Sequence, residues 1–287
     1  MKKQTVSLLV FLLATSGYFS SCNNTVNKNT GALEFDSIRV NETSHLFGDT
    51  AKPACNLIVR FTYAAKSSDI KLRDSLNSFL VSAFFGDKYI NMKPEEAIKK
   101  YTEKYINDYR NDLEPMYKKD EQEQEQEEGM NLEGWYSFYR SVEGSVKNYF
   151  KHLLVYRIDY NEYTGGAHGI YMATFLNMDL HTLSPVRLDD LFANDYKEAL
   201  TDLLWNQLMA DNKVKTRQEL EDIGYATTGE LAPTENFYLT PQGITFYYNV
   251  YDIAPYVMGP IEITLPYEIM QHLLKDDCMV LNEIRNS

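Results

Sequence analysis

The sequence predicts an α+β fold built of antiparallel sheets, with helices packed on one face and two associated subdomains. Strand-like runs rich in β-branched and aromatic residues stand before and after a pair of segments with helical spacing. The chain also contains 22 Tyr and 14 Phe among its 287 residues. Such an aromatic content is typical of sheets whose faces are only partly buried.

Residues 1–21 are predicted to form a lipoprotein signal peptide. Lys2 and Lys3 precede the apolar run VSLLVFLLA, and the sequence FSSC ends at Cys22. The apolar run is shorter than the roughly 20 residues of a membrane span, so it indicates a cleaved secretory signal. FSSC resembles the lipobox of bacterial lipoproteins, with Phe19 where leucine is commoner. We therefore expect a lipid on Cys22 to anchor the chain to a cell-envelope membrane. An ordinary signal with an incidental cysteine is the alternative.

The first subdomain is expected to begin after a flexible tether over residues 22–32, which is polar. The runs LEFDSIRV, residues 33–40, and CNLIVRFTYA, residues 55–64, predict two strands. A helix over 69–85 is indicated by apolar residues on one face and by Gly86 as a stop signal. Helices are therefore expected to cover a small sheet.

A second helix is predicted to start at Pro94 and to run into KKDEQEQEQEEGMN, residues 118–131. The alternating Glu and Gln residues offer no apolar face, so this stretch is interpreted as a boundary. We therefore predict one domain over 33–130 and a second over 131–287.

Three strand-like runs open the second domain, at residues 135–149, 152–163 and 170–180. A helix is expected from about Asp189 to Met209, and a short one from Pro266 to Leu274. Asp189 and Asp190 are interpreted as charges at a helix start rather than as paired catalytic carboxylates. Further strand-like runs between the two helices complete the prediction.

Charge limits the classes of partner. The formal net charge is −13, and it becomes −15 without the two lysines of the predicted signal. Such a surface repels phosphate backbones, so nucleic acid is excluded as a partner, whereas a basic protein is attracted. Cys55 and Cys278 also remain in the mature chain. The sequence leaves open whether they form a disulfide or stay free.

The stretch NEYTGGAHGIY, residues 161–171, is the most distinctive candidate site. Its glycines permit positive φ, so it is either a tight connection between strands or a binding loop around His168. No P-loop lysine follows the glycines, and the histidines are not at metal-ligand spacing from one another. We therefore predict no cofactor and no metal.

Three motifs carry a family resemblance. They are YTGGAHG at 163–169, LDDLF at 188–192 and YDIAPYVMGPIEITLPY at 251–267. Together they resemble the C-terminal extracytoplasmic domain of the RsiV anti-sigma factor family, also catalogued as DUF3298. The region of about residues 33–131 is similar to the N-terminal companion domain of PdaC-type peptidoglycan deacetylases.

The resemblance implies a domain that senses lysozyme by binding it. The lipoprotein signal stands where RsiV proteins have a sigma-factor-binding segment, so sigma-factor regulation is not expected. The deacetylases depend on an Asp-Asp pair and a spaced histidine pair in a separate catalytic domain. Neither occurs here, so deacetylase activity is not implied.

We therefore expect a non-enzymatic, extracytoplasmic and periplasm-facing binding module for a lysozyme-like protein or for cell-wall glycan. The expected ligand-binding residues are Tyr163, Thr164, Gly165, Gly166, His168, Gly169, Tyr251, Pro255 and Tyr256. One alternative is a glycan-modifying enzyme centred on His168 with Asp179 or Glu162 as its acid. Another is a structural member of an envelope complex.

Overall fold

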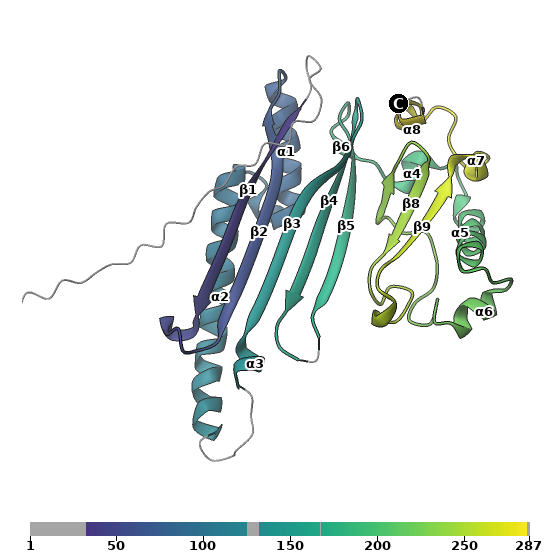
Figure 1. Cartoon of the computed structure of the whole chain (residues 1–287). Helices are drawn as coiled ribbons and strands as arrows, with labels where there is room; N and C mark the ends of the chain where they lie inside the picture. The colour runs from purple at the N-terminus through teal and green to yellow at the C-terminus, as the bar shows by residue number, and fades with distance from the viewer. Residues whose placement is uncertain (1–32, 125–131, 167, 286–287) are drawn as a thin grey trace, which may run out of the picture.

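The computed structural model describes residues 33–124, 132–166 and 168–285. They form a six-stranded sheet, a three-stranded sheet and several helices (Figure 1). The predicted signal peptide, Cys22 and the tether lie outside the described residues. Within the described ranges, no helix has both the length and the apolar character needed to cross a membrane.

The chain enters the six-stranded sheet through an antiparallel pair. Strand β1 (Glu34–His45) pairs with β2 (Ala54–Lys66), and the short helix η1 (Leu46–Gly48) joins them. Helix α1 (Ile70–Phe85) then begins where the carboxylate of Asp69 accepts the N–H of Leu72 at 3.0 Å. The two predicted strands and the first predicted helix are thus present, and both strands are longer than expected.

Three further helices lead back to the sheet. They are η2 (Asp87–Tyr89), α2 (Pro94–Gln124) and α3 (Leu132–Tyr136). Helices α1 and α2 pack on one face of β1 and β2, as Figure 1 shows. Leu57, Val59 and Phe61 of β2 lie fully buried under them, because alternate side chains of a strand point to the same face.

The rest of the sheet follows in sequence order. Its strands are β3 (Phe138–Tyr149), β4 (Leu153–Tyr163), β5 (Ile170–Asp179) and β6 (Ser184–Pro185). All neighbours are antiparallel except β2 and β3, which are parallel. The parallel pair arises because α1, α2 and α3 return the chain to the end at which β2 began. The sheet therefore continues across the predicted boundary at residue 131.

The three-stranded sheet is antiparallel and comprises β7 (Phe237–Leu239), β8 (Gly243–Tyr248) and β9 (Ile261–Pro266). Its helices are α4 (Leu188–Leu191), α5 (Tyr196–Asn212), α6 (Arg217–Asp222), η3 (Tyr256–Met258), α7 (Tyr267–Met270) and α8 (Met279–Arg285). This unit shares one core with the face of β4 and β5 that carries Leu153, Val155 and Phe175. The α+β prediction with two associated units is confirmed.

Two predicted helices differ from the structure for one reason. The expected helix over 189–209 is broken between α4 and α5, and the expected helix over 266–274 ends at Met270. Phe192 forms a β-bridge with Leu274, and the N–H of Ala193 donates to the carbonyl of Leu273 at 2.8 Å. The bridge requires extended backbone at Phe192 and Leu274, so the first helix stops at Leu191 and residues 271–273 form only a turn before the bridge.

Asparagine side chains join the two sheets along the edge of β5. The N–H of Ala173 donates to Oδ1 of Asn249 at 2.7 Å, and the N–H of Phe175 donates to Oδ1 of Asn236 at 2.9 Å. Asn177 is buried and donates to the carbonyl of Phe237 at 2.8 Å. Asn236 and Asn249 thus satisfy backbone N–H groups of β5 that β6, with only two residues, does not reach.

The two cysteines are free thiols in separate places. Cys55 is buried in the core beneath α1 and α2, whereas Cys278 packs at the margin of the core around the three-stranded sheet. The question that the sequence left open is answered in favour of free thiols.

Candidate functional site

The glycine stretch is the connection between β4 and β5. Gly165 and Gly166 have φ of 87° and 94°, in the left-handed region that glycine enters without strain. A Cβ on Gly165 would lie 2.9 Å from the carbonyl oxygen of Trp135, and one on Gly169 would lie 2.6 Å from that of Glu162. The backbone therefore packs more closely here than any other residue would allow.

The second part of the site is the segment of residues 249–259, which links β8 to β9. Tyr251 has φ of 71°, an unusual value for a residue with a side chain. The carboxylate of Asp252 accepts the N–H of Asn249 at 2.7 Å, and the N–H of Asp252 donates back to the carbonyl of Asn249 at 3.1 Å. Pro255 precedes η3, and Gly259, with φ of 73°, follows it. Hydrogen bonds and backbone restrictions thus fix this segment.

The two parts meet in a tyrosine–histidine cluster made of His168, Tyr171, Tyr251 and Tyr256. The ring of Tyr256 stacks on that of His168, with centroids 4.4 Å apart and planes 24° apart. The rings of Tyr171 and Tyr251 each have centroids 5.6 Å from that of Tyr256. Tyr256 is therefore the centre of the cluster.

Hydrogen bonding sets the tautomer of His168. Its Nδ1 lies 3.0 Å from the carbonyl oxygen of Gly169, and a carbonyl can only accept, so Nδ1 carries the proton. In the neutral ring Nε2 is then an acceptor, and the hydroxyl of Tyr251 donates to it at 3.3 Å. The contact joins residues that are far apart in sequence.

Part of this cluster faces solvent. His168 is exposed, Tyr251 is 46% exposed and the neighbouring Val257 is 90% exposed. Tyr171 and Tyr256 are half-buried, and Tyr256 contacts both exposed rings. The cluster thus offers an apolar surface edged by hydroxyl and imidazole groups.

The predicted site residues have different parts in this arrangement. His168, Tyr251 and Tyr256 come together, while the three glycines and Pro255 shape the backbone around them. Tyr163 supports the loop, because its hydroxyl donates to the carbonyl of Gly166 at 2.9 Å. Thr164 is exposed at the start of the loop. The prediction omitted Tyr171, although its position in the same sequence stretch was a usable signal.

The acids that the enzyme alternative required are directed elsewhere. The carboxylate of Glu162 accepts hydrogen bonds from Arg140 and from the hydroxyl of Tyr160, which belongs to the core beneath the helices. Asp179 lies at the opposite end of β5 from the glycine loop. The hydrogen bonds of Glu162 and Asp179 are therefore made with groups other than His168.

The adjacent aspartates at the start of α4 are structural, as predicted. Oδ2 of Asp190 accepts the N–H of Arg187 at 2.8 Å, and Oδ1 of Asp189 accepts the hydroxyl of Tyr196 at 2.8 Å. Burial, together with this carboxylate, raises the pKa of Tyr196. Both carboxylates are therefore engaged with neighbouring groups of their own chain.

Two family models match the chain. The model described as "Protein of unknown function (DUF3298)" matches residues 189–268, and the model "Deacetylase PdaC" matches residues 56–171. The second match extends past the predicted boundary at residue 131 and includes the glycine loop. A search of curated proteins finds no match.

Solved structures give the most extensive likeness. The crystal structure of a DUF3298 family member from Bacteroides fragilis has 62% sequence identity and a TM-score of 0.86, covering 91% of this chain and 100% of that chain. A DUF3298 family protein from Pseudomonas aeruginosa has 16% identity and a TM-score of 0.58, covering 85% of this chain and 95% of that chain. The second likeness concerns the fold alone. Because the Bacteroides fragilis protein is 62% identical over 91% of this chain, the chain belongs to the DUF3298 family.

Proposed function

We propose that this chain is a non-enzymatic, extracytoplasmic binding module, held on a bacterial cell-envelope membrane by a lipid on Cys22, whose ligand is a basic protein of the lysozyme kind. The tyrosine–histidine cluster carries this proposal. It is a partly exposed aromatic surface whose backbone is fixed on both sides, at the loop before β5 and at residues 249–259.

Tyrosine suits such a surface for physical reasons. Its ring supplies a large apolar area at a small cost in side-chain entropy, and its hydroxyl gives directional contacts, so tyrosine is enriched among residues that dominate protein interfaces. Because Tyr256 is already stacked on His168 and has an edge-to-face contact with Tyr171, binding would order few groups further. A surface that is ordered before the ligand binds favours recognition.

The net charge supports a basic partner. The whole chain has a formal charge of −13. An acidic protein attracts a cationic ligand over distances longer than contact, which raises the association rate and makes it sensitive to salt. Nucleic acid is disfavoured by the same charge.

Cell-wall glycan is the second candidate ligand, favoured by one observation. His168 is exposed and stacks on Tyr256, and an exposed ring that is held by stacking can pack against the apolar face of a sugar ring. Unlike binding to a basic protein, binding to a neutral sugar would depend little on salt concentration.

Binding of purified full-length chain to a panel of muramidases tests the proposal. We expect retention at low salt that weakens as salt increases. Tyr256→Ala should lower the affinity by about 10-fold or more, since loss of a hot-spot tyrosine at the centre of an interface costs about 2 kcal/mol or more. Ile269→Ala, an exposed apolar position on α7, is the matched control and should bind normally. Failure to retain any muramidase at low salt would contradict the proposal of a lysozyme-like ligand. Salt-insensitive retention on purified peptidoglycan would instead support the glycan.

A further inference from the structure

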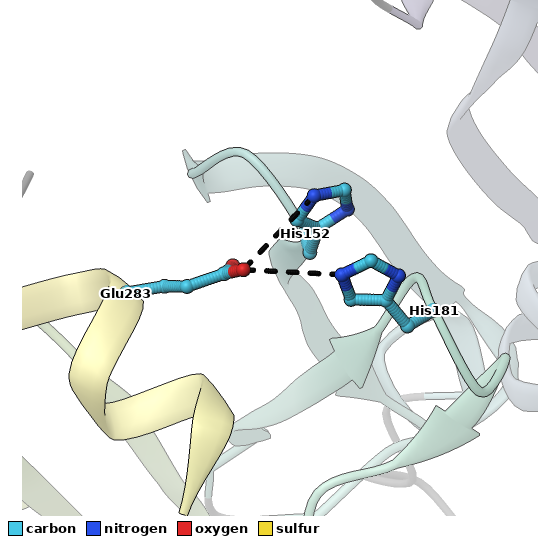
Figure 2. A group of neighbouring side chains, drawn as sticks. All are labelled: His152, His181 and Glu283. Carbon is cyan, nitrogen blue, oxygen red and sulfur yellow. Dashed lines mark ion pairs between the residues drawn. The ribbon is translucent and has the colours of Figure 1, made fainter.

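Two histidines and a glutamate meet at the end of the six-stranded sheet opposite to the tyrosine–histidine cluster. His152 lies in the turn between β3 and β4, His181 in the turn between β5 and β6, and Glu283 on α8. Figure 2 shows the Glu283 side chain reaching from α8 toward both imidazoles. Their separation in the sequence conceals this arrangement, and for that reason sequence spacing predicted no metal site.

The three side chains converge on a small space. Nε2 of His181 lies 3.8 Å from Oε1 of Glu283, and Nε2 of His152 lies 4.0 Å from the same oxygen. The imidazole rings stack with centroids 3.5 Å apart and planes 25° apart. One ligand atom from each residue can be chosen so that all lie within 4.8 Å of one another.

These distances suit a bound cation better than direct contact. Both N···O separations exceed the roughly 3.2 Å limit of a good hydrogen bond. Ligands bound to one zinc ion at about 2.0–2.2 Å in tetrahedral geometry lie roughly 3.3–3.6 Å apart. Side-chain rotation must turn the two stacked imidazoles so that a nitrogen of each points at one ion, and it would bring the three ligand atoms from within 4.8 Å of one another to such separations.

The backbone around the three residues is held in place. The N–H of Leu180 donates to the carbonyl of His152 at 2.7 Å, which ties the two turns together. The N–H of His181 donates to the carboxylate of Asp179 at 2.8 Å. Leu281 and Ile284 of α8 are buried in the core and fix the helix that presents Glu283. The backbone positions of the three residues are therefore fixed by hydrogen bonds and by packing.

We propose that His152, His181 and Glu283 bind one zinc ion, which fastens α8 to the two turns of the six-stranded sheet. Two imidazole nitrogens and a carboxylate are a ligand set that zinc accepts, whereas Mg²⁺ and Ca²⁺ prefer oxygen ligands alone. The side chains are 28%, 46% and 25% exposed, so an ion can enter from solvent and water can complete the coordination.

Zinc titration of the chelator-treated full chain tests this inference. We expect one zinc ion per chain by calorimetry and by metal analysis after dialysis, and a rise in Tm on adding ZnCl₂, since an ion that binds only the folded state stabilises it. His181→Ala and Glu283→Gln should each weaken zinc binding by about 100-fold and abolish the rise in Tm, since loss of even an outer-shell partner costs 10–100-fold. His181 is exposed in a turn, so its replacement leaves the core intact.

His272→Ala is the matched control, because His272 is an exposed histidine outside this group. It should bind zinc as the unmodified chain does, and MgCl₂ in excess should not compete. The inference is overturned if the chain binds no zinc, or if His181→Ala binds it as tightly as the unmodified chain. Neither result bears on muramidase binding, so the two proposals fail separately.

Discussion

At the scale of single residues, Cys55 shows how burial decides chemistry. The thiol lies in the core beneath α1 and α2, opposite Ser44 of β1. Burial raises the pKa of Cys55 to about 11, because the apolar surroundings penalise the thiolate. The thiol therefore stays protonated at neutral pH and is inert in the folded chain.

This shift predicts a loss of stability in alkali. In the unfolded chain Cys55 ionises near 9.0, whereas in the folded chain it ionises near 11, so the unfolded state loses its proton first. Stability is therefore unaffected below pH 9 and falls as pH rises from 9 to 11, by roughly 2–3 kcal/mol from this group. Urea unfolding across this range should show a smaller fall for Cys55→Ala than for the unmodified chain. Equal falls would contradict the assignment.

The same scale shows what sequence could not reveal about the candidate site. His168 and Tyr251 stood out because each lies in a recognisable motif, and the structure brings them within 3.3 Å. Nothing in those motifs indicates that Tyr256 stacks on His168 or that Tyr171 supports it. His152 and His181 stand in unremarkable turns, so only the pairing of β4 with β5 brings them together. Ring contacts of this kind depend on tertiary structure.

At the scale of elements, the glycine loop offers a comparison within one turn. Gly165 and Gly166 both have positive φ, but only Gly165 faces a backbone oxygen, that of Trp135. A Cβ on Gly166 would meet nothing within 4 Å. An alanine at Gly166 would therefore introduce backbone strain alone, whereas an alanine at Gly165 would introduce both backbone strain and steric overlap.

We expect Gly166→Ala to cost about 1–2 kcal/mol of unfolding free energy, which is the usual penalty for a side chain in the left-handed region. Gly165→Ala should cost a further 1–3 kcal/mol or so, because the new methyl also displaces α3. Urea unfolding of both variants gives the comparison. If the two losses were the same, contact with Trp135 would not be the reason for glycine.

Most elements followed from local pattern, and the exceptions share a cause. Period-two alternation and helical spacing predicted β1 to β5, α1 and α2, because these signals lie within each segment. The break between α4 and α5 depends on the bridge from Phe192 to Leu274, which no local window contains. The parallel pairing of β2 with β3 likewise depends on where the intervening helices return the chain.

At the scale of the whole molecule, the two ends of the six-stranded sheet differ in character. One end carries the tyrosine–histidine cluster, in which aromatic groups face solvent. The other end carries His152, His181 and Glu283 beside α8. Asn236 and Asn249 hold the three-stranded sheet to the edge of β5 between them. The two proposed sites are therefore presented by one continuous framework.

The parallel pairing of β2 with β3 has a consequence for how the chain folds. Strand β1 meets β2 through a short connection, and β3, β4 and β5 meet through turns. By contrast, Cys55 is paired with Phe138 across α1, η2, α2 and α3. Closing so long a loop has a high entropic cost, so contacts of this separation form late. Pulsed hydrogen exchange during refolding should protect β2 amides that point toward β1 before those that point toward β3. Simultaneous protection of both sets would mean that the helices hold the strands in place from the start.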